Sequence, residues 1–304
     1  MQSRRHETTD ATATLMLIAL SFAWGLTWPA MRVALEEIPP FSMRVVTCGL
    51  GAGGLLLVAA LQRRSFALGS VKDWAHVAVA SVLNIVGFTM LSAFALLLTA
   101  TSRVAILAYT MPIWAALFAR VVLGERFNRS RLIALALCVA GMAILIYPLA
   151  GGGIPLGLLL AVATGVTWAA GTVYQKWAHI DGDPVAVAGW QLAFAFAIIV
   201  ICLPFVEGSL QLSQAHAPAL FGMVFTGLVG SALAYFLWFK IIGRLPAMTA
   251  SLGILASPVI GVISTAVLLG EHPTVPDMIG FALIFAASAC VLLPSREPAP
   301  PEPA

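Results

Sequence analysis

Polar and aromatic side chains that could bind a small solute occur within long apolar stretches of this 304-residue sequence. Uncharged hydroxyl and amide groups can orient a zwitterion, and aromatic faces can stack on an apolar solute. Prolines inside helices leave backbone groups unpaired, and these could also face a solute. The candidate substrate-binding residues are Trp24, Thr27, Trp28, Asn84, Tyr109, Pro112, Thr167, Trp168, Tyr235, Trp238, Ser257 and Pro258. For each single residue, ordinary helix packing is the alternative interpretation.

Residues for catalysis or metal binding are not gathered in the sequence. The five histidines (His6, His76, His179, His216 and His272) are scattered, and the four cysteines lie in apolar runs without a CxxC pair. Metal sites and disulfide frameworks usually show short ligand spacings. We therefore predict no catalytic residues, no metal and no cofactor. The net charge of +3 is too small to suggest a nucleic-acid partner.

The composition indicates an integral membrane protein. Hydrophobic residues make up 61% of the chain and charged residues only 10%, against about 25% charged in soluble domains. About 20 apolar residues are needed for a helix to cross a bilayer. Ten stretches qualify: Ala13–Leu35, Pro40–Leu61, Trp74–Leu97, Arg103–Leu123, Arg131–Tyr147, Ile154–Trp177, Pro184–Leu203, Ala217–Ile242, Ala247–Leu269 and Asp277–Leu293. The predicted fold is all-α, with ten transmembrane helices.

The basic residues predict the orientation of these helices, because Lys and Arg concentrate in cytoplasmic loops. If the N-terminus lies inside, 13 of the 16 basic residues fall on the inner side. Only Arg32, Arg44 and Arg103 remain for the outer side. Both termini are therefore predicted to be cytoplasmic, in a bacterial inner membrane that serves as the protein's lipid partner.

The chain contains a repeat of about half its length. Gly25–Trp28 matches Gly165–Trp168 in the pattern Gly-x-Thr-Trp, and Pro112–Glu125 matches Pro258–Glu271 in the pattern Pro…Leu-Gly-Glu. Each unit holds five predicted spans, an odd number, so the second unit must be inverted in the membrane. Inverted repeats are typical of secondary transporters that bind substrate near the midplane. A duplication that only enlarged a helix bundle is the alternative.

These paired motifs resemble the EamA module, which defines ten-helix members of the drug/metabolite transporter superfamily. The resemblance covers nearly the whole chain, and the chain looks most like YddG-type aromatic amino-acid exporters. It implies residues 1–147 as the first repeat, residues 154–293 as the second, and 294–304 as a disordered Pro-rich tail. It also implies export of a small neutral or zwitterionic metabolite, such as an amino acid, by alternating access.

Two other functions stay open at this point: a membrane-embedded lipid-modifying enzyme, and a proton-coupled drug or metabolite exporter. All 13 acidic residues fall in tails, loops or helix ends, whereas proton and sodium sites usually place an ionisable group at membrane depth. This distribution favours a facilitator without ion coupling. The oligomeric state is not predicted, although a monomer is compatible with the pattern.

Two details concern the second span. Arg44 near its outer end is interpreted as snorkelling or as paired with Glu36 or Glu37, with a gating role as the alternative. The run Gly49–Gly54 matches GxGxxG, but it lies inside an apolar span without a preceding strand. It is better explained by close helix packing through Gly49 and Gly53.

The orientation can be tested with reporter fusions. Fusions at Ser3 and at Ser295 should both report a cytoplasmic location, since both ends follow the positive inner side. Fusions in the predicted outer loops, at Glu37 and at Glu271, serve as opposite controls. An external signal at Ser3 or Ser295 would show that the predicted number of spans is wrong.

Overall fold

The computed structural model describes residues 11–125, 129–147, 155–242, 244 and 254–292, and almost all of these residues are helical. The elements are α1 (Ala11–Leu35), α2 (Pro40–Leu61), α3 (Val71–Ala80), η1 (Ser81–Gly87), α4 (Phe88–Leu98), α5 (Thr101–Ala108), α6 (Met111–Val122), α7 (Arg129–Ile146), α8 (Leu156–Ala178), α9 (Pro184–Val206), α10 (Ala217–Phe225), η3 (Thr226–Leu233), α11 (Ala234–Ile242), α13 (Ala256–Leu269) and α14 (Val275–Leu292). The predicted tail at 294–304 lies outside the described residues.

These elements form the ten predicted spans. Eight are long and apolar enough to cross a membrane, and α13 and α14 are two shorter apolar helices. The third span joins α3, η1 and α4; the fourth joins α5 and α6; and the eighth joins α10, η3 and α11. Predicted and observed ends agree within three residues. The exception is the ninth span, where α13 begins at Ala256 and the predicted residues 247–253 lie outside the described part.

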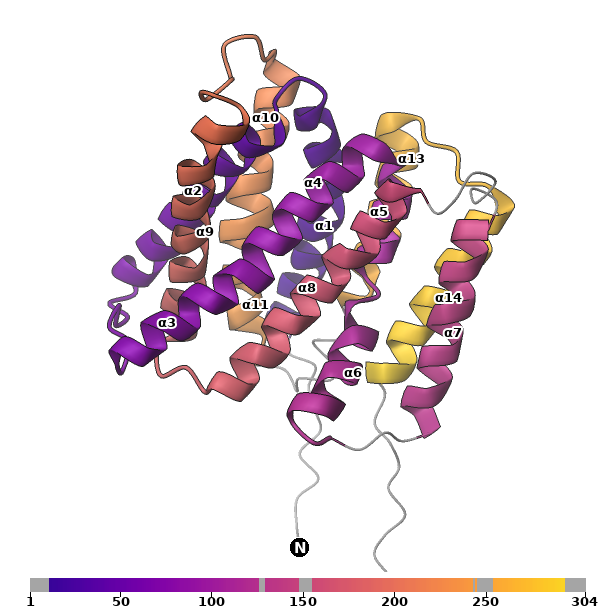
Figure 1. Cartoon of the computed structure of the whole chain (residues 1–304), viewed down its shortest axis with the longest axis horizontal. Helices are drawn as coiled ribbons and strands as arrows, with labels where there is room; N and C mark the ends of the chain where they lie inside the picture. The colour runs from indigo at the N-terminus through magenta and orange to yellow at the C-terminus, as the bar shows by residue number, and fades with distance from the viewer. Residues whose placement is uncertain (1–10, 126–128, 148–154, 243, 245–253, 293–304) are drawn as a thin grey trace, which may run out of the picture.

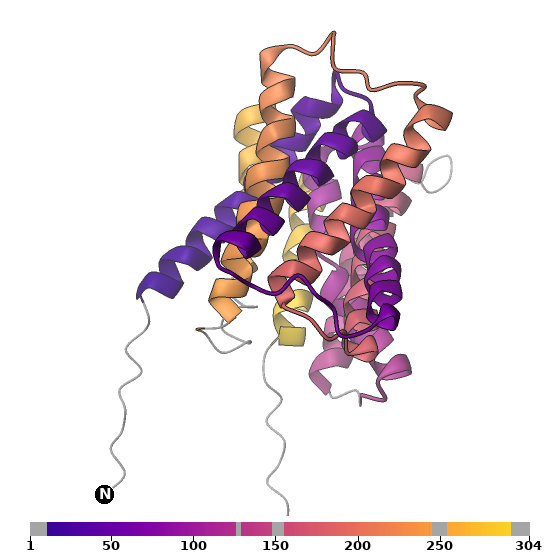
Figure 2. The same cartoon turned by 90° about the vertical axis from the view of Figure 1, so that its left-hand side faces the viewer.

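The two halves of the chain are interleaved. Helix α2 lies along α9, and α7 lies along α14 at the opposite side of the molecule (Figure 1). Helix α1 packs against α10, η3, α11 and α13 of the second half, while α8 packs against η1, α4, α5 and α6 of the first. The first helix of each half therefore packs mainly against helices of the other half. Helix α1 starts and α14 ends at the same end of the bundle (Figure 2).

The third and eighth spans share an irregularity that the sequence did not predict. Each contains a π-helical segment near its middle, η1 in the first half and η3 in the second. π-Helical turns are rare; they occur mostly as single-turn bulges inside α-helices and are frequently found at functional sites. Their equivalent placement shows that the repeat extends to the hydrogen-bonding pattern of the backbone.

The fourth span is broken between α5 and α6, two residues before Pro112. Pro112 lies in the first turn of α6, where proline is tolerated because its missing N–H would have no helical partner. The carbonyl of Tyr109 accepts a hydrogen bond from the Ser288 hydroxyl at 3.1 Å. A matching turn at Leu255 precedes Pro258 in the ninth span. Protein neighbours thus satisfy the backbone at the first break, as lipid surroundings require.

The Gly-x-Thr-Trp motifs form close contacts between the two halves. A Cβ on Gly165 would lie 2.9 Å from the Ala108 carbonyl oxygen, next to the break in the fourth span. Thr167 of the same motif packs on Gly87 of η1. In the other half, Gly25 packs on Ile260 of α13. The glycine of each motif therefore lets a helix approach the opposite half closely.

The close approach at Gly165 can be tested by a methyl group. Gly165→Ala should lower stability by about 1–3 kcal/mol, because the new Cβ overlaps a backbone oxygen that cannot move away easily. Gly53→Ala is the matched control, because Gly53 is exposed and no atom lies within 4 Å of the position that a Cβ would take there.

The expected packing role of Gly53 is therefore wrong, whereas Gly49 does contact Phe196.

The measurement is the thermal unfolding temperature of the purified protein in detergent. Gly53→Ala should leave it unchanged or raise it, since alanine favours the helix more than glycine does. Equal stability of Gly165→Ala and the wild type would contradict the tight contact between α8 and the fourth span.

Candidate functional site

A cavity of about 720 Å³ lies between the two halves of the molecule. It is lined by α1, α2, η1 and α4 from the first half and by α8, α9, η3 and α11 from the second. Both π-helical segments contribute, through residues such as Asn84 and Ser231. The cavity therefore lies where the interleaved halves meet and where the backbone departs from the regular helix.

Eight of the predicted substrate-binding residues line this cavity. They are Trp24, Thr27, Trp28, Asn84, Tyr109, Trp168, Tyr235 and Trp238. The other four, Pro112, Thr167, Ser257 and Pro258, are not among its lining residues. The structure thus places most of the candidates at one site, and their role in binding stays a prediction.

Six aromatic rings form a continuous series through the cavity. Trp24 contacts both Trp238 and Tyr235. Tyr235 stacks on Trp168, with 6.4 Å between the ring centroids and an interplanar angle of 22°. The Trp168 and Phe88 ring centroids are 5.0 Å apart, and Phe88 in turn contacts Trp28. The rings come from α1, α4, α8 and α11. Sequence reasoning missed Phe88, because a phenylalanine in an apolar run carries no signal of the direction in which it points.

Polar groups interrupt this aromatic lining. Gln191 donates to Gln175 at 2.8 Å, and both line the cavity. Arg44 also lines it, with 2% of its surface exposed. The expectation that Arg44 snorkels or pairs with Glu36 or Glu37 is therefore wrong. Glu36 pairs with Arg32 and Glu37 with His216 instead.

One end of the cavity is open to water. Lys176 and His179, both exposed, line it at the end of α8, and Gly182 follows in the connection to α9. This is the end at which α1 begins and α14 stops (Figure 2). Among the described residues that line the cavity, none is an aspartate or glutamate. No group of three His, Cys, Asp or Glu side chains in the described ranges could hold a metal ion.

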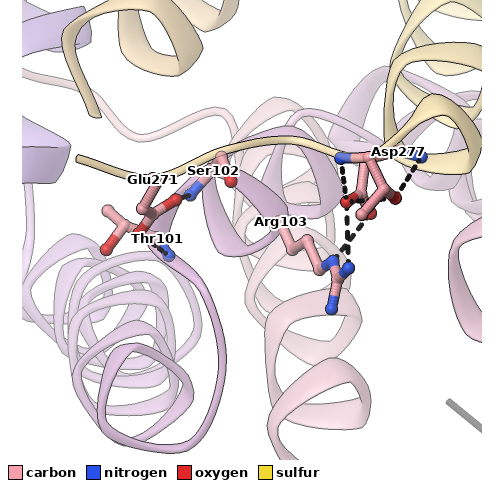
Figure 3. Close-up of polar contacts among 6 residues, drawn as sticks. Thr101, Ser102, Arg103, Glu271 and Asp277 are labelled. Atoms are coloured by element: carbon pink, nitrogen blue, oxygen red, sulfur yellow. Dashed lines mark hydrogen bonds and ion pairs between the residues drawn. The ribbon is translucent and has the colours of Figure 1, made fainter. Parts of the chain in front are cut away.

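Away from this exposed end, the lining residues Trp28, Met31 and Arg44 are buried, so the cavity is closed there. At that end of the molecule, carboxylates of the second half bind helix N-termini of the first. Glu271 accepts hydrogen bonds from the backbone N–H groups of Thr101 and Ser102 at the start of α5, at 2.7 and 2.9 Å (Figure 3). Glu207 binds the N–H groups of Phe41 and Ser42 at the start of α2 in the same manner. Helix N-termini attract anions because their N–H groups are unpaired and their dipole is positive.

The environment of Glu271 favours its ionised form. Burial of the carboxyl group raises its pKa, but the hydrogen bonds from Ser102 and Thr101 outweigh burial and hold the pKa below the ordinary value. Beside it, Arg103 forms a bidentate ion pair with Asp277 at 2.7 and 2.9 Å (Figure 3). These contacts join α5 to the α13–α14 connection and to α14.

Glu37 and Glu125 form weaker links nearer to solvent. The backbone N–H of His216 lowers the pKa of Glu37 and ties the α1–α2 connection to the start of α10. At the other end of the molecule, a hydrogen bond from Lys176 lowers the pKa of Glu125, which also pairs with Arg131. Glu125 occupies in the first repeat the position of Glu271 in the second, but it binds side chains in place of backbone groups.

Comparison with known proteins agrees with this architecture. The profile of the EamA-like transporter family matches residues 11–147 and 155–293. The chain is 28% identical over 283 residues to the uncharacterized transporter YvbV of Bacillus subtilis, covering 92% of each chain. It is 26% identical to a protein of Salmonella typhimurium named "Probable amino-acid metabolite efflux pump", covering 91% of this chain and 92% of that one.

A solved crystal structure of another protein superposes with a TM-score of 0.63 at 23% sequence identity, covering 92% of this chain and 96% of that chain, and this likeness concerns the fold alone. The family profile covers nearly the whole chain in two copies, in agreement with the repeated motifs and the ten helical spans. The protein is thus a multi-pass membrane protein, and it belongs to the EamA-like transporter family.

Proposed function

We propose that the protein transports small neutral or zwitterionic metabolites, in particular amino acids including aromatic ones, across the bacterial inner membrane. The observation that carries this proposal is a cavity lined by six contacting rings, open at one end and closed at the other. Such a chamber has the size of binding sites for small molecules, which are typically about 300–1,000 Å³. Its mostly uncharged lining suits a solute whose charges sum to zero.

The asymmetry of the two ends supports alternating access as the mechanism. The closed end is held by contacts between the halves, with Glu271 on α5 and Glu207 on α2 as the central ones. Opening that end requires these contacts to separate while the end near Lys176 closes. With the predicted orientation, the structure corresponds to an inward-open state. The name of the Salmonella relative supports export as the direction.

The transport proposal can be tested with purified protein in proteoliposomes. Counterflow of labelled phenylalanine should be observed, and Trp168→Ala should raise the half-saturating concentration about two- to tenfold, since one aromatic contact contributes about 0.5–1.5 kcal/mol. Trp177→Ala is the control, because Trp177 is half exposed and contacts His76 and Tyr174 instead of the cavity. Absence of counterflow for every amino acid tested would refute the proposal.

Transport should run downhill without an ion. A proton or sodium site usually needs an acidic side chain at membrane depth, and none of the described residues that line the cavity is an aspartate or glutamate. With equal phenylalanine on both sides of the vesicle membrane, an imposed pH or sodium gradient should therefore cause no net accumulation. Accumulation that disappears when the gradient is collapsed would reveal a coupling site.

A further inference from the structure

Two charged side chains are buried in the described part of the protein, Arg44 and Asp277. Asp277 has its counter-charge, because Arg103 binds both of its carboxylate oxygens. Arg44 has none: no described carboxylate forms an ion pair with it. Removing a charge from water is costly unless an opposite charge or many hydrogen bonds replace the lost hydration. The two residues therefore differ in a way that requires an explanation.

The contacts of Arg44 are all to uncharged groups. Its Nε donates to the Thr89 carbonyl oxygen at 3.0 Å, and its Nη2 donates to the Ser92 hydroxyl at 3.2 Å and to the Met31 sulfur at 3.3 Å. A guanidinium group has five N–H donors, and a thioether sulfur is a weak acceptor. The two N–H groups of Nη1 have no protein acceptor among the described residues, and one of those on Nη2 has a poor one.

These unused donors belong to a side chain that lines the cavity. The α2 backbone and the contacts with Thr89 and Ser92 hold the guanidinium plane in position, so little further ordering is needed to bind an anion. Nη1 and Nη2 together present the two parallel N–H groups that a carboxylate accepts in the bidentate arrangement. Only the weak contact with the Met31 sulfur has to be given up.

We propose that Arg44 binds the carboxylate of the transported solute, so that the substrates of this protein are carboxylates and the cavity discriminates against their amides and amines. This assignment rests on the proposed transport function and narrows it. The bound carboxylate supplies the missing counter-charge, and the aromatic series from Phe88 to Trp238 accommodates the remainder of the molecule.

A second polar group favours an α-amino acid within this class. The Asn84 side-chain oxygen is buried, has no hydrogen-bond partner, and belongs to a residue that lines the cavity. Asn84 precedes Thr89 by five residues along the third span, so the two positions are separated by about 7 Å along the helix axis. A carbonyl oxygen accepts hydrogen bonds from an ammonium group. An amino acid therefore offers one charged group to each of the two unsatisfied groups of the cavity.

The test compares four compounds that share the phenylethyl framework as competitors of labelled phenylalanine counterflow: phenylalanine, phenylalaninamide, phenethylamine and 3-phenylpropionate. With the wild type, phenylalanine should compete at least about tenfold better than the amide or the amine. The amide offers Arg44 one neutral carbonyl oxygen in place of a carboxylate, and the amine offers it no acceptor. In Arg44→Met, phenylalanine should lose this advantage, and Arg44→Lys should retain part of it. Arg32→Met, which removes a guanidinium group outside the cavity lining, should behave as the wild type.

The same compounds are then tested as stabilisers in thermal unfolding of the purified wild type. Stabilisation by phenylalanine and not by its amide supports the carboxylate site even if Arg44→Met fails to fold. Equal competition and equal stabilisation by phenylalanine and the amide would overturn the assignment while counterflow leaves the transport function standing. Stabilisation by phenylalanine and not by its amide, without any counterflow, would support the carboxylate site and refute the transport function. Absence of both the selective stabilisation and the counterflow would overturn the carboxylate site and the transport function together.

Discussion

The need to satisfy every backbone polar group inside the lipid hydrocarbon is the constraint on which this structure depends. A regular helix meets it alone, but the fourth span is interrupted before Pro112, and the third and eighth spans contain π-helical turns. At the first of these places the Tyr109 carbonyl binds the Ser288 hydroxyl of α14. Irregular backbone is thus confined to positions that another part of the protein covers, and the cavity forms beside these positions.

The exchange of first helices between the halves supplies that cover. Gly165 in α8 brings this helix against the break between α5 and α6, and Gly25 in α1 brings that helix against α13. Because α1 and α8 each pack mainly on the other half, neither half holds a complete set of neighbours for its own irregular spans. The tryptophans of the two motifs, Trp28 and Trp168, then meet the same cavity from helices of opposite direction.

Much of this fold could be predicted from the sequence, because bilayer thickness fixes the length of each apolar stretch. The predicted span Pro40–Leu61 coincides with α2, and the paired motifs indicated the repeat. Directions of side chains could not be predicted in the same way. Thr27 and Thr167 occupy equal positions in their motifs, yet only Thr27 lines the cavity. Hydropathy does not distinguish a lipid-facing from a cavity-facing residue, and single-sequence patterns do not reveal π-helical turns.

The misinterpretation of Arg44 has a similar cause. Sequence distance suggested nearby acids as partners, whereas the fold brings Thr89 and Ser92 of another span against Arg44. The acids Glu36 and Glu37 pair with Arg32 and His216. Partners that are distant in sequence decide the environment of a buried charge. The side chain is therefore a residue whose role only the three-dimensional arrangement could indicate.

The carboxylates on helix N-termini have a consequence for the energetics of motion. When Glu271 leaves the start of α5, water can bind both the carboxylate and the exposed N–H groups, so each broken contact is replaced by hydration instead of being lost. The protein contacts of the closed arrangement and the hydration of the same groups in the open one are then similar in free energy, so the two arrangements differ little. A solute with a modestly higher affinity for one arrangement is enough to redistribute the population. The pKa of Glu271 is lowered in the closed arrangement, so ionised Glu271 stabilises that arrangement at pH values above the ordinary carboxyl pKa. This stabilisation is lost as the pH falls through the lowered pKa. Polar contacts that water replaces on opening can therefore close this end tightly and still separate reversibly. A purely apolar contact surface of equal area would combine these two properties less readily.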